Sequence, residues 1–340
     1  MLNKKGQTIF FDNPPHIKAF ASVVGKKEAN GPLKEYFDVI CMDSFMGQKS
    51  YEKAEAQFQN TAVSRAITKA GVSKENIDYL LGGDLLNQCI GSSYGLREFD
   101  IPFLGLYGAC STIIEGLGLS AVLCGSGAAK TVCNVSSSHF CSAERQFRFP
   151  LSYGGQRTPT NQWTVTGAGA IVLSKGEKKK GAEPFINAVT FGKIEDLGVT
   201  DINNMGAAMA PAAASTISAF FNDSGKTPDD FDLILTGDLG VLGSDLLIKL
   251  LLDNGIDISR NHNDCGKMIY DIESQDVHSG GSGCGCCASV LCSKILKEMK
   301  GKDRADVLVI ATGALMSTVS VQQGESIPSI AHLVHISKRG

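Results

Sequence analysis

The stretch YGACST, residues 107–112, places a cysteine directly before a run with helical character, STIIEGLGLSAVL. Backbone N–H groups at the start of a helix lower the pKa of a nearby thiol, and the same groups can hold an anion. Cys110 is therefore a candidate nucleophile or ligand-binding thiol. The alternative is a small buried side chain, which is what most cysteines are, and the chain has 11 of them.

A thiol that performs acyl transfer also needs a base for its proton and paired donors for the developing oxyanion. His278, within VHSGGSGCG at 277–285, is the best candidate for the base. The glycines that follow it allow close approach of the backbone. The alternative is a histidine on a surface loop.

A basic stretch, SSHFCSAERQFRFPLSYGGQR at 137–157, offers ligand-binding side chains: His139, Arg145, Arg148, Tyr153 and Arg157. Guanidinium groups suit the recognition of carboxylates because their donors form a planar fork. The alternative is that each arginine pairs with a neighbouring carboxylate, such as Glu144, or faces water.

Two further polar residues, Asp84 and Asn87, follow a predicted strand in GGDLLNQ. Ligands of α/β proteins commonly bind at this end of a strand. Asp84 could accept a hydrogen bond from a protonated ring nitrogen of a ligand, bind a calcium ion that accompanies the ligand, or accept a hydrogen bond from a hydroxyl of the protein itself. We favour the last of these, a structural role.

Cys284, Cys286 and Cys287 lie close together, as zinc ligands often do. No second CxxC or paired histidines follow at the usual spacing, so the zinc signal is weak. We expect these residues to pack at the start of a helix, and we expect no metal site.

The elements that must position these residues occur twice. KAGVSKENIDYLLGGDLL (69–86) and DSGKTPDDFDLILTGDLG (223–240) share glycines and aspartates, among them Asp84 and Asp238, at a constant offset of 154 residues. Each copy reads as a helix end, a loop and a buried strand that stops at Gly-Asp. Alternating helices and continuous apolar strands favour mostly parallel sheets covered by helices. We predict two duplicated halves, 1–180 with Cys110 and 181–340 with His278, joined near the lysine-rich GEKKKGAEP (176–184).

Composition restricts the class of protein. The chain has 340 residues and a net charge of −3, which argues against a protein that binds nucleic acid. The cysteines are not spaced as disulfide staples and no signal peptide precedes them, so we expect a reducing, intracellular compartment. No window approaches 18 uninterrupted apolar residues, so we expect a soluble chain that reaches a membrane only through a partner.

Several motifs resemble the thiolase superfamily, whose fold is a duplicated five-layered α/β/α/β/α arrangement. YGACST resembles its cysteine turn, VTGAGAIVLS (165–174) the strand that closes its first half, and VHSGGSGCG its glycine-rich histidine loop. GGDLLNQ, GLYGACSTIIEGL, SSHFCSAERQFRFPLSYGGQRTPT and QDVHSGGSGCGCCAS are similar to one subfamily from endospore formers. That subfamily is a soluble part of the machinery that moves dipicolinic acid into the developing spore, and it binds this acid.

Two positions depart from the pattern of the superfamily's enzymes. Asp238 in TGDLG stands where a neutral or imidazole donor is expected, and a carboxylate cannot donate to an oxyanion unless it is protonated. Thr166 in TGAGA replaces the acidic residue of the GDGAG motif of ketoacyl synthases. We therefore expect a thiolase-like scaffold with an incomplete catalytic set.

The resemblance implies a non-catalytic protein that binds dipicolinic acid and supports its uptake together with membrane subunits. We expect the ligand site to include Cys110, His139, Arg148, Asp84, Asn87, Thr166 and His278. We expect no cofactor, dipicolinate with or without calcium as the ligand, a homodimer, and peripheral association with the inner membrane of the forespore. The alternative is an acyltransferase or condensing enzyme that uses Cys110 on acyl-CoA or acyl-carrier thioesters.

Overall fold

A computed structural model describes residues 2–147, 157–175, 183–301 and 304–338. Ten of the 13 strands of its main sheet form two five-stranded halves that have the same topology. The first half has the order β6-β5-β7-β9-β3, with the bounds Phe103–Gly105, Tyr79–Gly83, Thr131–Ser138, Gly167–Ser174 and His16–Val24. The second has the order β12-β11-β14-β15-β10, with the bounds His262–Asp264, Leu233–Thr236, Asp306–Ala314, Ser329–Ser337 and Phe185–Phe191.

Strand directions repeat as well. In each half the first three strands of this order are parallel and the last two pair antiparallel. Both halves also shift register near the start of the last strand of this order, between Ile17 and Ala19 in β3 and between Ile186 and Ala188 in β10. The two halves join where Phe185 of β10 pairs with His16 of β3. The predicted duplication is therefore present in the fold, whereas the predicted junction at 176–184 lies largely outside the described residues.

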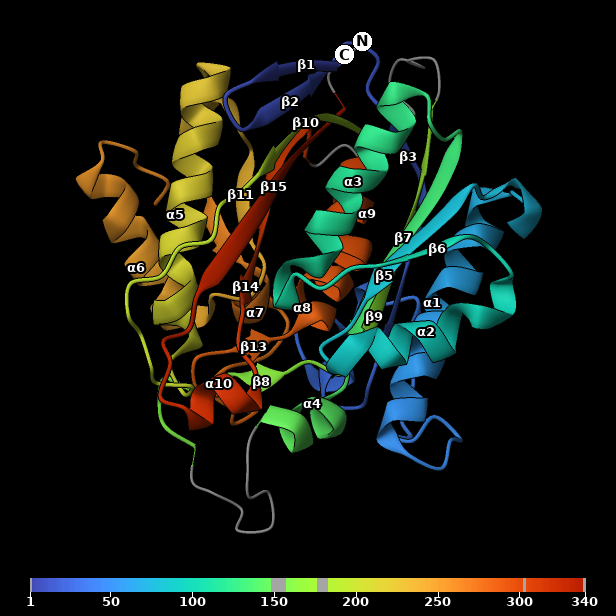
Figure 1. The fold of residues 1–340 in the computed structure, drawn as a ribbon, viewed down its shortest axis with the longest axis horizontal. Helices are drawn as coiled ribbons and strands as arrows, with labels where there is room; N and C mark the ends of the chain where they lie inside the picture. The colour runs from blue at the N-terminus through green and yellow to red at the C-terminus, as the bar shows by residue number, and fades with distance from the viewer. Residues whose placement is uncertain (1, 148–156, 176–182, 302–303, 339–340) are drawn as a thin grey trace.

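Helices complete five layers (Figure 1). On the outer face of one half-sheet lie α1 (Tyr51–Ala70) and α2 (Ile90–Leu96), and on that of the other α5 (Met205–Ser224) and α6 (Gly240–Asp253). The long outer helices end alike, because Gly71 after α1 and Gly225 after α5 both adopt the left-handed conformation that glycine favours. The predicted α/β/α/β/α thiolase-like arrangement is confirmed.

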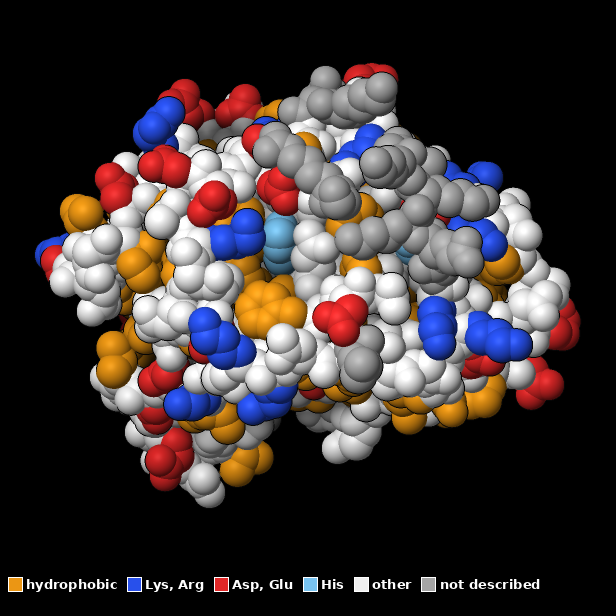
Figure 2. Space-filling model, turned by 90° about the horizontal axis from the view of Figure 1, so that it is seen from above, with side chains coloured by type: hydrophobic (Ala, Val, Ile, Leu, Met, Phe, Trp, Pro, Cys, Tyr) orange, Lys and Arg blue, Asp and Glu red, His pale blue; other side chains and the backbone are white. Residues whose placement is uncertain are grey.

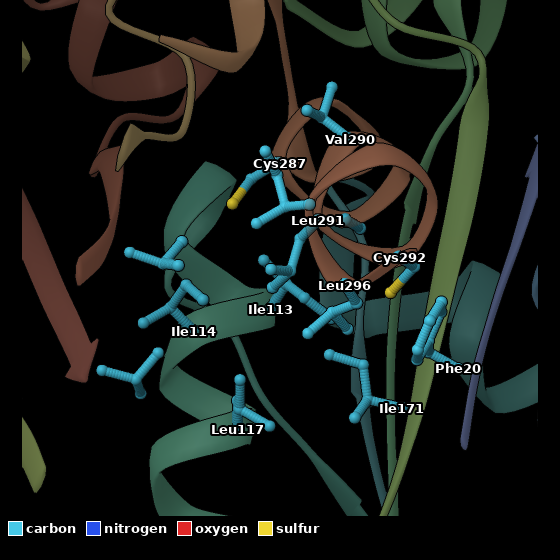
Figure 3. Close-up of a cluster of buried hydrophobic side chains, with 14 of the residues drawn as sticks. Phe20, Ile113, Ile114, Leu117, Ile171, Cys287, Val290, Leu291, Cys292 and Leu296 are labelled. Atoms are coloured by element: carbon cyan, nitrogen blue, oxygen red, sulfur yellow. The ribbon is translucent and has the colours of Figure 1, made fainter. Parts of the chain in front are cut away.

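The central layer is formed by α3 (Thr112–Ser126) from the first half and α8 (Cys284–Val290) from the second. The chain continues from α8 through a π-helical turn (Leu291–Ile295) into α9 (Leu296–Gly301). Figure 3 shows Ile113 and Leu117 of α3 facing Leu291 and Leu296 of this second segment. The stretch Ala109–Ser126 is long and apolar enough to cross a membrane, but 67% of it is buried between the half-sheets. It is a core helix.

Short elements gather at one end of the molecule, opposite the chain termini (Figure 1). They are α4 (Phe140–Phe147), β8 (Trp163–Thr164), β13 (Gly281–Ser282) and α10 (Thr318–Gln322). The remaining elements are β1 (Leu2–Lys5), β2 (Thr8–Phe11), β4 (Val39–Ile40) and α7 (Cys265–Met268). Seen from above in Figure 2, basic and acidic side chains are interspersed on the surface, which agrees with the net charge of −3.

Candidate functional site

Cys110 lies in a pocket of about 600 Å³, part of it open to solvent, at the end of the molecule that carries α4 and α10. The pocket is built by both halves of the chain, because its lining includes Tyr107, Cys110, Phe147, Met209, Ser282 and Met316. Its walls are mainly apolar, with polar groups near the cysteine. This is the composition typical of a site for a small organic ligand.

A tight turn presents Cys110 to the pocket. Ala109, just before it, has φ +50°, a left-handed conformation that is strained for a residue with a side chain. The Ala109 carbonyl accepts hydrogen bonds from the Thr112 hydroxyl (2.7 Å) and the Cys284 thiol (2.8 Å). Strand β14 approaches so closely that a Cβ on Gly313 would lie 2.1 Å from the Gly108 carbonyl oxygen. The turn is therefore held from both halves of the protein.

The second half supplies a carboxyl group that faces Cys110. Asp238 is buried, and its carboxyl group interacts with the Cys110 thiol. Its Oδ1 accepts from the Thr312 hydroxyl at 3.0 Å, and its Oδ2 accepts from the Ser282 hydroxyl at 3.0 Å and the Gly283 N–H at 3.1 Å. The residue that departs from the catalytic pattern in the sequence is thus the direct neighbour of the thiol.

The electrostatics of this pair keep the thiol protonated. Burial, followed by the negative charge of Asp238, raises the pKa of Cys110 well above the usual value for cysteine, and the Gly283 N–H opposes this only in part. Burial also raises the pKa of Asp238, against the hydrogen bonds that it accepts. Because the thiolate is the reactive form of cysteine, this raised pKa disfavours activation of Cys110 as a nucleophile.

His278 differs from the sequence expectation, because it is not among the described residues that line the Cys110 pocket. Its Nε2 lies 3.5 Å from Oδ1 of Asp276, in a loop where both residues have a left-handed φ, +53° and +50°. From the same segment of the chain, Ser282 lines the pocket and the Gly283 N–H interacts with the Cys110 thiol. The structure therefore does not pair His278 with Cys110 as an acid–base couple.

His139 and Thr166 lie together in a different hollow, also lined by Lys27, Phe140 and Trp163. The Nε2 of His139 contacts the Ser44 carbonyl at 2.8 Å, and its Nδ1 accepts from the Cys141 N–H. The Thr166 hydroxyl accepts from the Phe140 N–H at 3.0 Å. His139 and Thr166 are thus separated from Cys110, in a hollow on the other side of α4 and β8.

Comparison with known proteins decides the family. Residues 5–337 match the family described as stage V sporulation protein AD. The stage V sporulation protein AD of Bacillus subtilis (strain 168) is 44% identical to this chain over 334 residues, which cover 98% of the chain and 97% of that protein. The chain belongs to the stage V sporulation protein AD family.

Solved structures agree with the thiolase-like fold of this stage V sporulation protein AD family member. The 3-oxoacyl-(acyl-carrier-protein) synthase III of Aquifex aeolicus VF5 is 12% identical, with a TM-score of 0.57, over 95% of this chain and 99% of that one. A variant of OleA from Xanthomonas campestris, crystallised with cerulenin, is 14% identical, with a TM-score of 0.60, over 96% and 97%. At such identities the likeness concerns the fold alone.

Asp84, the counterpart of Asp238 in the first half, has a structural role in this member of the stage V sporulation protein AD family. It is buried and accepts from the N–H of Leu86 (2.9 Å) and from both the N–H (2.7 Å) and the hydroxyl (2.6 Å) of Ser92. It also stands near Cys284, because burial and then the Asp84 charge raise the pKa of that thiol. Each half therefore places its aspartate near a cysteine of the other half.

A buried carboxyl beside Asp84 connects α1 to the wall of the Cys110 pocket. Glu55 of α1 accepts from the hydroxyl of Ser137 in β7 at 3.0 Å and from that of Ser142 in α4 at 2.6 Å. Burial, followed by the Asp84 charge, raises the pKa of Glu55 from 4.5 to about 8. The protonated carboxyl thereby helps to fix α4, which carries the pocket residue Phe147.

Other predicted residues lie around α4. Asn87 faces a separate surface hollow, where its Oδ1 accepts from Gln146 at 3.3 Å. Arg145 pairs with Glu52, and Arg157 with Asp276 at 3.0 Å. Arg148 and Tyr153 lie outside the described residues, so their predicted ligand contacts stay predictions.

Sequence reasoning missed the thioether wall of the pocket, formed by Met205, Met209 and Met316. The sequence could have indicated part of this wall, because Met205 and Met209 are four residues apart and so share one face of a helix. The three-cysteine segment packs as expected, with Cys284, Cys286 and Cys287 all buried at the start of α8. Among the described residues, no group of three or more His, Cys, Asp or Glu side chains is arranged to bind a metal.

Proposed function

We propose that this stage V sporulation protein AD family member is a receptor for dipicolinic acid that binds it in the Cys110 pocket without covalent chemistry. The observation that carries the proposal is the pairing of Cys110 with Asp238, which keeps the thiol protonated inside an accessible pocket. The family resemblance supplies the ligand. We further propose that the protein works inside the cell, next to the inner membrane of the forespore, with membrane subunits as partners.

The pocket offers groups that suit a flat aromatic diacid. Phe147, Met209 and Met316 provide apolar surface for the ring. Burial raises the pKa of Tyr107, so its hydroxyl stays protonated and can donate to a carboxylate. The protonated Cys110 thiol is a second, weaker donor.

Calorimetry tests this function. We expect saturable heat with dipicolinate, and much weaker binding of isophthalate, which lacks the ring nitrogen. Cys110→Phe should abolish the tight binding that distinguishes dipicolinate from isophthalate, because the larger side chain fills the pocket beside Asp238. Cys141→Ser is the matched control, since Cys141 lies on α4 but lines the other hollow. Equal binding of both ligands, or full binding by the Cys110→Phe variant, would show that the pocket is not the receptor site.

The second candidate function is acyl transfer by Cys110. It is favoured by the position of Cys110 immediately before α3, in a pocket open to solvent. Incubation with acyl thioesters of several chain lengths, followed by mass spectrometry, tests it. A covalent adduct on Cys110 would support the enzyme and count against the receptor.

We also propose a homodimer through β6, the edge strand of the first half-sheet. Its residues are exposed although they are apolar: Phe103 is 36% and Leu104 is 44% accessible, next to Tyr107 at 42%. An exposed apolar edge strand invites pairing with a second chain. Leu104→Lys should convert a dimer to a monomer in size-exclusion chromatography with light scattering. Leu252→Lys, at a more exposed position on α6, should leave the dimer intact. A parent chain that is monomeric would refute the proposal.

A further inference from the structure

The hollow on the far side of α4 is distinct from the Cys110 pocket. Strand β8 separates the two, because Thr164 lines the Cys110 pocket whereas Trp163 lines the second hollow. Along α4, Ala143 and Phe147 face the first and Phe140 faces the second. The second hollow encloses about 760 Å³, part of it open to solvent.

Basic side chains converge on Trp163 at this hollow. The Lys27 ammonium lies 4.0 Å and the Arg157 guanidinium 4.5 Å from its ring centre, while Phe140 stacks on the ring at 3.9 Å. Burial, and then the charge of Arg157, lower the pKa of Lys27, which shows how closely the two cations are held. Such crowding of like charges is unfavourable unless an anion lies among them.

Asp276 is the anion that the chain itself provides, and it is held loosely. Its side chain is 80% exposed, yet it accepts from Arg157 at 3.0 Å and lies 3.5 Å from His278. Both Asp276 and His278 have left-handed φ values, +50° and +53°, which are strained for these residues. The exposed carboxylate of Asp276, in a strained loop, therefore faces the basic side chains of Arg157 and His278.

Unpartnered polar atoms point to a ligand as well. Nη1 of Arg157 is buried without a hydrogen-bond partner. Oε2 of Glu28 is also buried and unpartnered, and Glu28, which is only 1% exposed, lines the hollow. Buried donors and acceptors normally have partners in a folded protein. A carboxylate occupant would accept from the Arg157 Nη1. Burial raises the pKa of Glu28, so a protonated Oε2 could donate to the same carboxylate.

We propose that this hollow is a second ligand site, which takes an organic carboxylate with a small apolar body, and that Asp276 stands in for the ligand's carboxylate when the site is empty. The ligand's anionic group would pair with Arg157 and Lys27, and its body would lie in the hollow lined by Phe140 and Trp163. The site lies outside the proposed receptor pocket, and its occupation does not depend on dipicolinate binding there.

Fluorescence tests the proposal directly, because Trp163 is the only tryptophan of the chain. Benzoate added to the full-length protein should change the Trp163 emission in a saturable way, whereas benzamide, its neutral counterpart of similar shape, should not. Inorganic phosphate, which has charge but no apolar body, should bind more weakly than benzoate. No response to benzoate, or an equal response to benzamide, would overturn the proposal.

Variants give the sharper result. Asp276→Asn removes the internal competitor and should tighten benzoate binding by about two- to fivefold, the range expected for a partly exposed ion pair. Lys27→Met and Arg157→Gln should weaken it by at least as much. Because Asp276 is exposed, its variant tests the proposal even if the other two are destabilised, and weaker binding by Asp276→Asn would contradict it. Cys110→Phe should leave the benzoate response unchanged, and its loss there would place benzoate in the receptor pocket instead.

Discussion

Replacing Asp238 with asparagine should make the Cys110 thiol react with iodoacetamide roughly 10- to 100-fold faster at mildly alkaline pH, since a unit charge at hydrogen-bonding distance shifts a pKa by one or more units. The variant removes the negative charge that raises the pKa of Cys110. The amide can still accept from Thr312, and its nitrogen can donate to the thiolate. Alkylation of the peptide that contains Cys110, followed by mass spectrometry, separates this thiol from the other ten of the 11 cysteines.

Ser282→Ala is the matched control, because it removes one hydrogen bond to Asp238 and leaves the charge in place. Its alkylation rate should stay close to that of the parent. If Asp238→Asn reacts no faster than the parent protein, Asp238 does not keep the thiol protonated, and the main support for a non-covalent receptor is lost.

Replacing Glu55 with glutamine should make the free energy of unfolding markedly less dependent on pH. The folded state raises the pKa of Glu55 from 4.5 to about 8, so it retains a proton that the unfolded chain has released. The free energy of unfolding therefore falls as pH rises from about 4.5 to about 8, and this loss levels off above that range. Over the whole window the loss is on the order of 3–5 kcal/mol for this group.

Urea unfolding at about pH 5.5 and about pH 8 measures the effect. The parent should lose more stability between the two conditions than Glu55→Gln, whose amide can keep the hydrogen bonds with Ser137 and Ser142. Buried carboxyls that do not interact with Glu55, such as Asp264 with a pKa raised to about 7, contribute equally to both proteins. Glu35→Gln, at an exposed position, should behave like the parent. Parallel pH dependence in all three proteins would contradict the role of Glu55.

The architecture could be predicted from the sequence because it depends on local patterns that occur twice. Gly71 and Gly225 end helices, and the apolar runs before Asp84 and Asp238 form strands, so the repeat alone indicates a duplicated α/β fold. The position of Cys110 directly before α3 follows from the same reasoning. These features need no knowledge of distant contacts.

The composition of the site could not be predicted in the same way, because it depends on contacts between the halves. That Asp238 faces Cys110 follows from how the two half-sheets meet, which no local pattern specifies. His278 lies outside the described lining of the Cys110 pocket, in a loop whose left-handed backbone at 276 and 278 is not indicated by any local pattern in the sequence.

The crossed pairing of aspartates and cysteines suggests an ancestry for the pocket. If the duplication arose from two identical chains, their homodimer had two equivalent pockets at the subunit boundary, each with a cysteine from one chain and an aspartate from the other. Fusion into one chain freed the two copies to diverge. The Cys110 copy stayed open, while the Cys284 copy became a sealed part of the core whose thiol now supports the turn beside Cys110.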